Sequence, residues 1–329
     1  MNILVTGGAG YIGSHACKAL AAKGHVPITY DDLSRGNRWA VKWGPLLEGD
    51  IADAVRLRAA LEQYRPAALM HFSAYAYVGE SVEKPLLYYR NNFAATASLL
   101  HTLTEFGCIP MVFSSSCAVY GEPERLPIPE DHPQRPINPY GHSKLFVERM
   151  LADVATASGL PWMALRYFNA AGADPDGEIG EAHDPETHLV PLVLAAARDG
   201  VPVRIFGDDY DTPDGTCVRD YVHVADIADA HVKALEHLLN GGESGALNLA
   251  NARGFSVREV IAAAEKVCGR AVPYETGARR PGDPPVLIGD AGRARTLLGW
   301  QPARSDLAMQ IEDAWRWMQA QRVGAGIKC

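Results

Sequence analysis

A tyrosine, a lysine and a serine in this sequence could together manage a proton transfer. Tyr140 and Lys144 are four residues apart, so on a helix their side chains lie on one face. A phenol titrates near ~10 in water, and acting as a base at neutral pH requires a shift of about 3 units, or roughly 4 kcal/mol. The Lys144 ammonium would favour the phenolate. Ser116 follows an apolar run at 110–115, which predicts a buried strand whose C-terminal end faces a ligand.

A glycine-rich loop could supply the partner for a hydride transfer. Residues 7–13 read Gly-Gly-Ala-Gly-Tyr-Ile-Gly, between an apolar strand at 2–6 and an amphipathic helix. Such a loop turns tightly and brings a dinucleotide pyrophosphate to the helix N-terminus. Asp31, 18 residues after Gly13, stands where a carboxylate binds the adenosine ribose. The carboxylates of Asp31 and Asp32 favour NAD as the cofactor, although Arg35 leaves room for NADP. The alternative interpretation of residues 7–13 is a plain glycine-rich turn.

Composition limits the classes of partner. The chain has 329 residues, 47% of them hydrophobic, and 31 Lys and Arg against 39 Asp and Glu give a net charge of −8. This balance argues against nucleic acid and anionic membranes as partners. With no signal-peptide or membrane-spanning pattern, we expect a cytoplasmic protein. The six cysteines are scattered, so we expect neither a disulfide framework nor a metal site, and His71 and His223 are interpreted as structural.

The first half of the chain alternates strand and helix patterns. Strands are expected at 2–6, 26–30, 46–49, 68–72, 110–115 and 162–168, with helical patterns after residue 11 and at 53–64, 86–105 and 140–157. This alternation predicts an α/β fold with a Rossmann-like, doubly wound parallel sheet. Loops rich in Gly, Pro and Asp follow Asn169. We therefore expect a Rossmann domain over 1–168, with a returning segment near 217–245, and a smaller C-terminal α/β substrate-binding lobe over 169–329.

Eight blocks of the sequence match one family. The chain resembles the UDP-glucose 4-epimerases of the extended short-chain dehydrogenase/reductase family, and the exopolysaccharide-type enzymes of bacteria above all. The matching blocks are residues 6–13, 48–51, 78–81, 91–92, 138–144, 165–172, 214–221 and 279–283. The resemblance implies a homodimer built on the helices around 86–105 and 140–157. The chain departs from the family pattern at one position: Ala76 stands where family members often have a lysine near the cofactor phosphates.

The resemblance assigns roles to residues along the whole chain. Catalysis would belong to Ser116, Tyr140 and Lys144. The implied NAD-binding residues are Gly7, Gly10, Tyr11, Ile12, Gly13, Asp31, Asp50, Ile51, Phe72, Asn91, Ser114, Tyr140, Lys144 and Tyr167. The implied UDP-sugar-binding residues are Ser116, Tyr140, Asn169, His188, Leu189, Arg204, Phe206, Arg219, Arg280, Asp283 and Leu287. Of these, Arg219 and Arg280 would bind the diphosphate, Phe206 would cover uracil, and Asp283 would bind the ribose. The plain alternatives are that Ile51 and Phe206 are ordinary core residues and that Asn91 is an amide that faces solvent.

By this resemblance, Tyr140 removes the proton of the sugar 4′-hydroxyl while C4′ passes a hydride to NAD. Ser116 would hydrogen-bond the reacting oxygen, and the hydride would return to the other face of a 4-keto sugar. Residues 116–120 contain no acid of the kind that related dehydratases and decarboxylases carry, which favours simple epimerisation. Leu287, of intermediate size, leaves UDP-pentose and UDP-N-acetylhexosamine open as substrates. A non-catalytic NAD-responsive binding protein is the alternative from another class.

Overall fold

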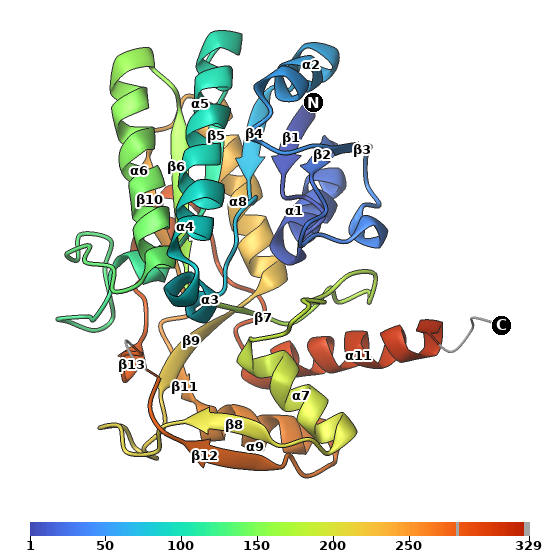
Figure 1. The fold of residues 1–329 in the computed structure, drawn as a ribbon, viewed down its shortest axis with the longest axis vertical. Helices are drawn as coiled ribbons and strands as arrows, with labels where there is room; N and C mark the ends of the chain where they lie inside the picture. The colour runs from blue at the N-terminus through green and yellow to red at the C-terminus, as the bar shows by residue number, and fades with distance from the viewer. Residues whose placement is uncertain (281–282, 326–329) are drawn as a thin grey trace.

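Two lobes make up the protein in the computed structural model, which describes residues 1–280 and 283–325. The larger lobe contains the N-terminus, and the smaller one lies below it in Figure 1. Pro281 and Gly282 of the 279–283 block, and Cys329, lie outside the described residues. No helix in the described part of the chain is long and apolar enough to cross a membrane.

A seven-stranded parallel sheet forms the middle of the larger lobe. Its strand order is β10-β6-β5-β4-β1-β2-β3, so the chain starts near the centre, winds outward to β3, and then continues in the other direction from β4. This confirms the predicted Rossmann-like fold. The strands are β1 (Asn2–Thr6), β2 (Val26–Asp31), β3 (Leu46–Glu48), β4 (Ala68–His71), β5 (Met111–Ser116), β6 (Trp162–Tyr167) and β10 (Gly245–Leu249).

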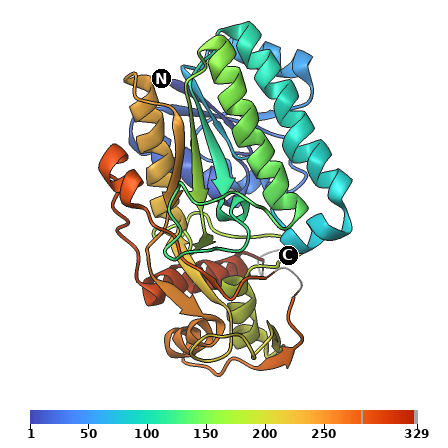
Figure 2. The same ribbon diagram turned by 90° about the vertical axis from the view of Figure 1, so that its left-hand side faces the viewer.

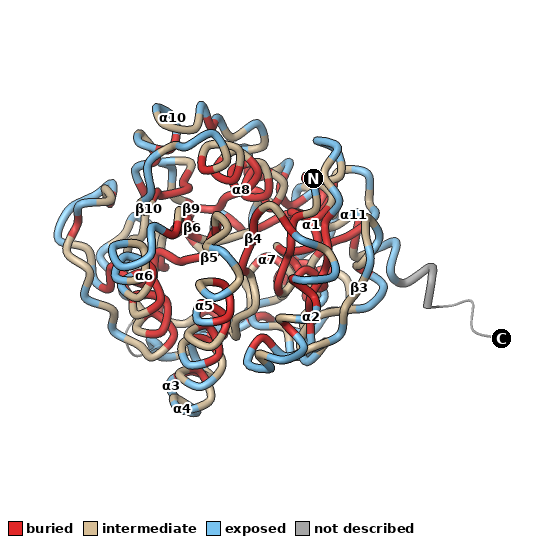
Figure 3. Tube along the Cα trace, turned by 90° about the horizontal axis from the view of Figure 1, so that it is seen from above, coloured by how far each residue is buried: buried red, intermediate tan, exposed pale blue. Residues whose placement is uncertain are grey.

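Helices cover both faces of this sheet (Figure 2). On one face, α1 (Tyr11–Ala22) and α8 (Val224–Leu239) pack into an apolar cluster with Trp300. On the other, α2 (Ala54–Tyr64), α5 (Ala95–Phe106) and α6 (Pro139–Ser158) form a second cluster rich in leucine. The buried residues concentrate along the strands and the inward sides of these helices (Figure 3).

A short helical series precedes α5: α3 (Val78–Glu83), α4 (Pro85–Tyr88) and a π-helix, η2 (Tyr89–Ala94).

The smaller lobe has its own sheets and core. Strand β9 (Val218–His223) pairs with β7 (Asn169–Ala171), β11 (Gly254–Ser256) and β13 (Val286–Leu287), and β8 (Val203–Phe206) pairs with β12 (Tyr274–Gly277). Helices α7 (Leu189–Asp199), α9 (Val257–Cys268) and α11 (Leu307–Ala325) pack on a third apolar cluster. Between β9 and β11 the chain re-enters the larger lobe as α8 and β10, and α10 (Gly292–Leu298) packs beside them.

A buried ion pair joins the second helical layer to the sheet. The Arg166 guanidinium on β6 donates to the Glu148 carboxylate on α6 at 2.9 Å, and both side chains are at most 5% exposed. Ser115 also donates to Glu148, at 2.5 Å. Arg166 donates to the Tyr120 hydroxyl at 2.9 Å, and that hydroxyl donates to Asn248 of β10 at 2.7 Å. The network therefore ties β5, β6, β10 and α6 together.

Replacing Arg166 by methionine should destabilise the fold by about 3–5 kcal/mol, because the buried Glu148 charge loses its partner. Chemical denaturation with guanidinium chloride measures this difference. The matched control is Arg58→Met, which breaks an ion pair with Glu105 whose two side chains are 44% and 45% exposed. That change should cost no more than about 1 kcal/mol. Equal losses in the two variants would contradict the role assigned to the buried pair.

Candidate active site

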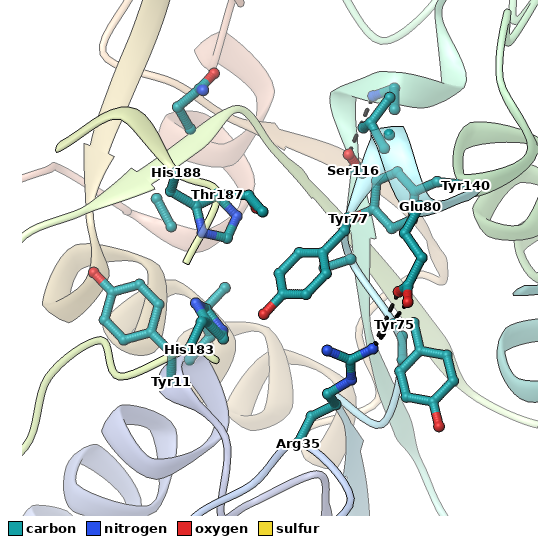
Figure 4. A pocket seen from close by; sticks show the side chains of 18 of the residues that line it. Tyr11, Arg35, Tyr75, Tyr77, Glu80, Ser116, Tyr140, His183, Thr187 and His188 are labelled. Atoms are coloured by element: carbon teal, nitrogen blue, oxygen red, sulfur yellow. Dashed lines mark hydrogen bonds and ion pairs between the residues drawn. The ribbon is translucent and has the colours of Figure 1, made fainter. Parts of the chain in front are cut away.

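One cavity of about 820 Å³ lies between the C-terminal edge of the large sheet and the smaller lobe (Figure 4). Every residue that the sequence assigned to catalysis, cofactor or substrate lines it. In the larger lobe these residues lie on or directly after β1, β2, β3, β4, β5 and β6 and on α1, η2 and α6; in the smaller one they lie on or beside β7, β8, β9, β13 and α7. The fold thus brings both predicted sets of contacts to a single space, while the role of each residue stays a proposal.

The glycine loop fits a dinucleotide pyrophosphate. Gly7 has a φ of +72°, and a Cβ there would lie 2.5 Å from the Ser73 nitrogen. A Cβ on Gly13 would lie 2.2 Å from the Gly7 carbonyl oxygen, so α1 packs directly against the end of β1 only because residue 13 is glycine. No side chain caps α1 at Gly10. Its first N–H groups are therefore left for an anion in the cavity.

Asp31 ends β2 beside this loop. Its two carboxylate oxygens accept hydrogen bonds from the backbone N–H groups of Ala9, at 3.0 Å, and Leu33, at 2.9 Å. Burial raises the pKa of the carboxyl. The Asp32 carboxylate accepts hydrogen bonds from the backbone N–H and the hydroxyl of Ser34, so it stabilises the loop that follows β2. Each Asp31 carboxylate oxygen keeps a second lone pair, so Asp31 can still accept a hydrogen bond from a ribose hydroxyl.

Arg35 is already engaged by side chains. Its guanidinium pairs with Glu80 at 3.1 Å and lies over the rings of Tyr75 and Tyr77, 5.3 Å and 5.1 Å from their centroids (Figure 4). Lys84 pairs with the same Glu80 at 3.4 Å. Both cations line the cavity near Ala76, the position that departs from the family pattern.

Ser116, Tyr140 and Lys144 meet where β5 ends against α6. Tyr140 is 8% exposed and Lys144 is 3% exposed. The Lys144 ammonium donates to the Ser114 carbonyl at 2.8 Å and lies 5.8 Å from the centroid of the Tyr140 ring. The Ser116 hydroxyl accepts from the Ala118 N–H at 3.2 Å, so it caps the end of the strand and keeps its own hydrogen for a second partner.

Burial dominates the ionisation of this pair. It raises the pKa of Tyr140 well above the ordinary value of a phenol, and the neighbouring Tyr167 adds to the rise, while the Ser116 hydroxyl opposes it. Burial also lowers the pKa of Lys144 to about 7, with Glu148 opposing. Desolvation therefore favours the neutral form of both groups. The Lys144 ammonium that the sequence places beside Tyr140 therefore needs a further positive charge to favour the phenolate in this environment.

The remaining cofactor residues line the cavity around this pair. Tyr167, at the end of β6, shares a 2.5 Å hydrogen bond with Ser114. Phe72 follows β4 and lies against His231, with ring centroids 4.7 Å apart. Asp50 accepts from the Ala52 N–H at 2.8 Å, and Ile51 is 6% exposed, so it serves the core as well as the cavity.

Asn91 and Asn92 lie in the π-helix η2, but they differ in burial. Asn91 is half-buried, lines the cavity and donates to Asn92 at 3.0 Å. Asn92 is 2% exposed, and its amide bonds the backbone N–H and carbonyl of Tyr75, both at 2.9 Å, and the Ser143 hydroxyl at 3.1 Å. Asn92 thus holds the loop after β4 against α6. Sequence reasoning missed this role, and only the adjacency to Asn91 pointed to it.

The smaller lobe contributes an aromatic surface and cations. The guanidinium groups of Arg280 and Arg204 lie near the Phe206 ring, 4.3 Å and 5.3 Å from its centroid. Arg219 is buried and forms an ion pair with Asp283. The remaining predicted contacts lie on nearby elements: Asn169 begins β7, Leu189 begins α7, and Leu287 ends β13 beside Arg219.

His188 precedes α7 and faces two carboxylates. Its Nδ1 atom lies 2.7 Å from Glu181 and 3.0 Å from Glu186, and these partners raise the pKa of the imidazole to about 10 against the effect of burial. His71 and His223 are buried as expected: His71 lies between the Thr6 and Thr96 hydroxyls, at 2.7 Å and 3.0 Å, and His223 pairs with Asp313 at 3.2 Å.

Comparison with known proteins agrees with this geometry. The chain belongs to the NAD dependent epimerase/dehydratase family, whose model matches residues 3–250. It is therefore an enzyme of an NAD-dependent family, and the non-catalytic alternative falls. It is 51% identical to the UDP-glucose 4-epimerase of Rhizobium meliloti (strain 1021) over 98% of both chains. The resemblance found in the sequence is confirmed.

Solved structures extend the similarity to three dimensions. The UDP-glucose 4-epimerase of Brucella ovis, in complex with NAD, superposes with a TM-score of 0.93 at 53% identity, over 95% of this chain and 97% of that one. The enzyme from Stenotrophomonas maltophila, with bound NAD and formylated UDP-arabinopyranose, gives a TM-score of 0.94 at 40% identity, over 98% and 99%. The similarity covers both lobes.

The lowered pKa of Lys144 makes stability depend on pH. Between about pH 7 and 10.5 the unfolded chain holds a proton that the folded chain has released, so the free energy of unfolding should rise with pH. Lys144→Met removes this slope, which approaches 1.4 kcal/mol per pH unit within the window. The stability gained by Lys144→Met should therefore shrink from pH 7 to 10. Urea denaturation at several pH values measures it, with the exposed Lys266→Met as control; parallel curves for Lys144→Met and wild type would contradict the prediction.

Proposed function

We propose that this enzyme interconverts UDP-glucose and UDP-galactose by inverting C4′ through a transient 4-keto sugar, with NAD retained between cycles. The observation that carries the proposal is one shared cavity. Ser116, Tyr140 and Lys144 line it together with the glycine loop on one side and Phe206 and Arg280 on the other. The two curated relatives that are 51% identical to this chain are named UDP-glucose 4-epimerases, which supports the same reaction.

The residues present fit NAD. The uncapped N-terminus of α1 would hold the pyrophosphate and Asp31 the adenosine ribose, while Asp50 and Ile51 would contact adenine. Asn91, Phe72, Ser114 and Tyr167 would surround the rest of the cofactor. When bound, NAD supplies the acceptor and donor of the hydride. Arg35 pairs with Glu80 rather than standing free, which favours a cofactor without a 2′-phosphate.

Tyr140 would take the proton of the 4′-hydroxyl and return it at the end of the cycle. Because burial raises the pKa of this phenol, the cation of a bound cofactor has to join Lys144 in stabilising the phenolate. Ser116, with its hydroxyl hydrogen free, would hydrogen-bond the reacting oxygen. A buried site makes such electrostatic help larger than it would be in water.

The smaller lobe would hold the UDP group. Phe206 offers a flat face for uracil, and Arg219 and Arg280 have the planar donor groups that suit phosphate oxygens. Asp283 would bind the ribose while keeping Arg219 in place, since the two already form an ion pair. Arg204, His188, Asn169, Leu189 and Leu287 would complete the walls of the nucleotide and sugar pockets.

The sugar itself has a second candidate. The structure from Stenotrophomonas maltophila that shares 40% identity contains formylated UDP-arabinopyranose, and Leu287 has a side chain of intermediate size. A UDP-pentose is therefore the alternative substrate. Comparing kcat/KM for UDP-galactose, UDP-xylose and UDP-N-acetylglucosamine ranks the three sugars directly.

We further propose that residues 1–168 with α8 and β10 hold the cofactor and that the rest of 169–329 mainly binds the sugar nucleotide. We also propose a cytoplasmic homodimer. The five cysteines among the described residues are free thiols, which suits a reducing compartment. Val82 and Leu86, 62% and 79% exposed beside the proposed interface helices, support a partner on that face. Sedimentation equilibrium tests the assembly.

Incubating the purified protein with UDP-galactose and no added cofactor should yield UDP-glucose, because the predicted NAD stays bound through each cycle. Chromatography of the nucleotide sugars measures the conversion. Turnover only after NAD is supplied would contradict retention of the cofactor. Turnover of UDP-xylose alone would move the assignment to the pentose.

Tyr140→Phe should lower kcat by roughly 10²- to 10⁴-fold, since the variant loses the proton-transfer group but keeps the ring. Bound NAD, released by heat and quantified, should remain near the wild-type level. The matched control is Tyr274→Phe on β12, where the side chain is 44% exposed and the change should leave kcat unaltered. Near-normal turnover by Tyr140→Phe would remove the base assignment.

A further inference from the structure

Two glutamates and two histidines gather on the loop between β7 and α7. They are Glu181, His183, Glu186 and His188, and one potential ligand atom from each lies within 4.8 Å of all the others. Figure 4 shows His183 and His188 side by side on the cavity wall, near Tyr11 and Tyr77. Only His188 belongs to the contacts that the sequence suggested.

The donor atoms converge on one small space. The Nδ1 atom of His183 lies 3.0 Å from Glu181 and 3.7 Å from Glu186, and the Nδ1 atom of His188 lies 2.7 Å and 3.0 Å from the same two carboxylates. Both rings thus present the same nitrogen to the same pair of oxygen donors. Two imidazole nitrogens and two carboxylate oxygens form a donor set that suits Zn²⁺.

Neighbouring groups hold these donors in place. The backbone N–H groups of Thr187 and His188 donate to one Glu186 oxygen at 2.7 Å and 2.8 Å. The His183 ring lies edge-on to Tyr11 and Tyr77, with centroids 6.2 Å and 5.8 Å away. Supporting contacts of this kind orient metal ligands and strengthen binding.

A second acidic cluster shows the contrast. Asp174, Asp176 and Glu178 also place their oxygens together, but Lys18 pairs with all three at 2.7–2.8 Å. The lysine already neutralises that cluster. Around Glu181 and Glu186, by contrast, the ion-pair partners within the described part of the chain are the two imidazoles, which are themselves ligands when they lose a proton.

We propose that Glu181, His183, Glu186 and His188 bind one divalent transition-metal ion of the Zn²⁺ class. The ion replaces the protons that the imidazoles share with the glutamates, so each ring enters the site neutral. This site lies on the cavity wall beside Leu189 and shares His188 with the proposed sugar-nucleotide pocket, while metal binding itself is measured without turnover. It also runs against the sequence expectation of no metal, which rested chiefly on cysteine spacing.

Equilibrium dialysis of the full-length protein against Zn²⁺, with metal analysis by mass spectrometry, tests the proposal. We expect one ion per chain, and at least about tenfold weaker binding in His183→Gln, since even outer-shell partners cost about 10- to 100-fold. His101→Gln is the matched control, because His101 is 72% exposed and faces Glu105 across one helical turn. It should bind like wild type. Unchanged binding in His183→Gln, or no stoichiometric binding to wild type, overturns the proposal and leaves an ion-pair cluster only.

X-ray absorption on the zinc-loaded wild type excludes the cysteines independently of any variant. The proposal expects only nitrogen and oxygen neighbours at about 2.0–2.2 Å. Sulfur at about 2.3 Å would assign the ion to a thiol and overturn it. A normal circular dichroism melting curve for His183→Gln confirms that lost binding is not lost folding; if that variant is unfolded, Glu186→Gln serves in its place with the same expected loss.

Discussion

The close packing of α1 on the end of β1 is the constraint from which the rest of the site follows. A Cβ on residue 13 would lie only 2.2 Å from the Gly7 carbonyl oxygen, so the helix can lie this close to the strand only because residue 13 is glycine. That position aims the uncapped N-terminus of α1 at the C-terminal edge of the sheet. The proposed catalytic groups must then come from strands that end and helices that begin at the same edge, as β5 and α6 do.

Desolvation governs the chemistry that such a position allows. Around Tyr140 and Lys144 the loss of water outweighs the nearby Glu148 charge, so the phenol holds its proton more tightly and the amine releases its proton more readily. The pair therefore responds strongly to any charge that enters the cavity. Under the mechanism proposed above, such a dyad would act as a base only when charged ligands occupy the cavity.

Local sequence patterns predicted the elements better than the contacts among them. Six of the seven strands of the large sheet were predicted to within about one residue at each end, because buried strands are continuous apolar runs bounded by turns, whereas β10 was not predicted as a strand. Tyr140 and Lys144 were found because helical spacing places them together. The Glu148–Arg166 pair, the Asn92 amide and the cluster at 181–188 were missed, since each depends on distant segments meeting or on the path of a loop. The short strands of the smaller lobe have too few residues for any period to show.

The route of the chain has a consequence for its synthesis. Strand β10 completes the edge of the large sheet beside β6, and α8 covers the same face as α1, yet both are made only after β7, α7, β8 and β9 of the smaller lobe. A nascent chain that has just produced β6 therefore exposes an unpaired strand edge and an uncovered apolar face on the ribosome. Completion of the larger lobe must wait until about eighty further residues have been synthesised. The two lobes therefore fold together rather than one after the other.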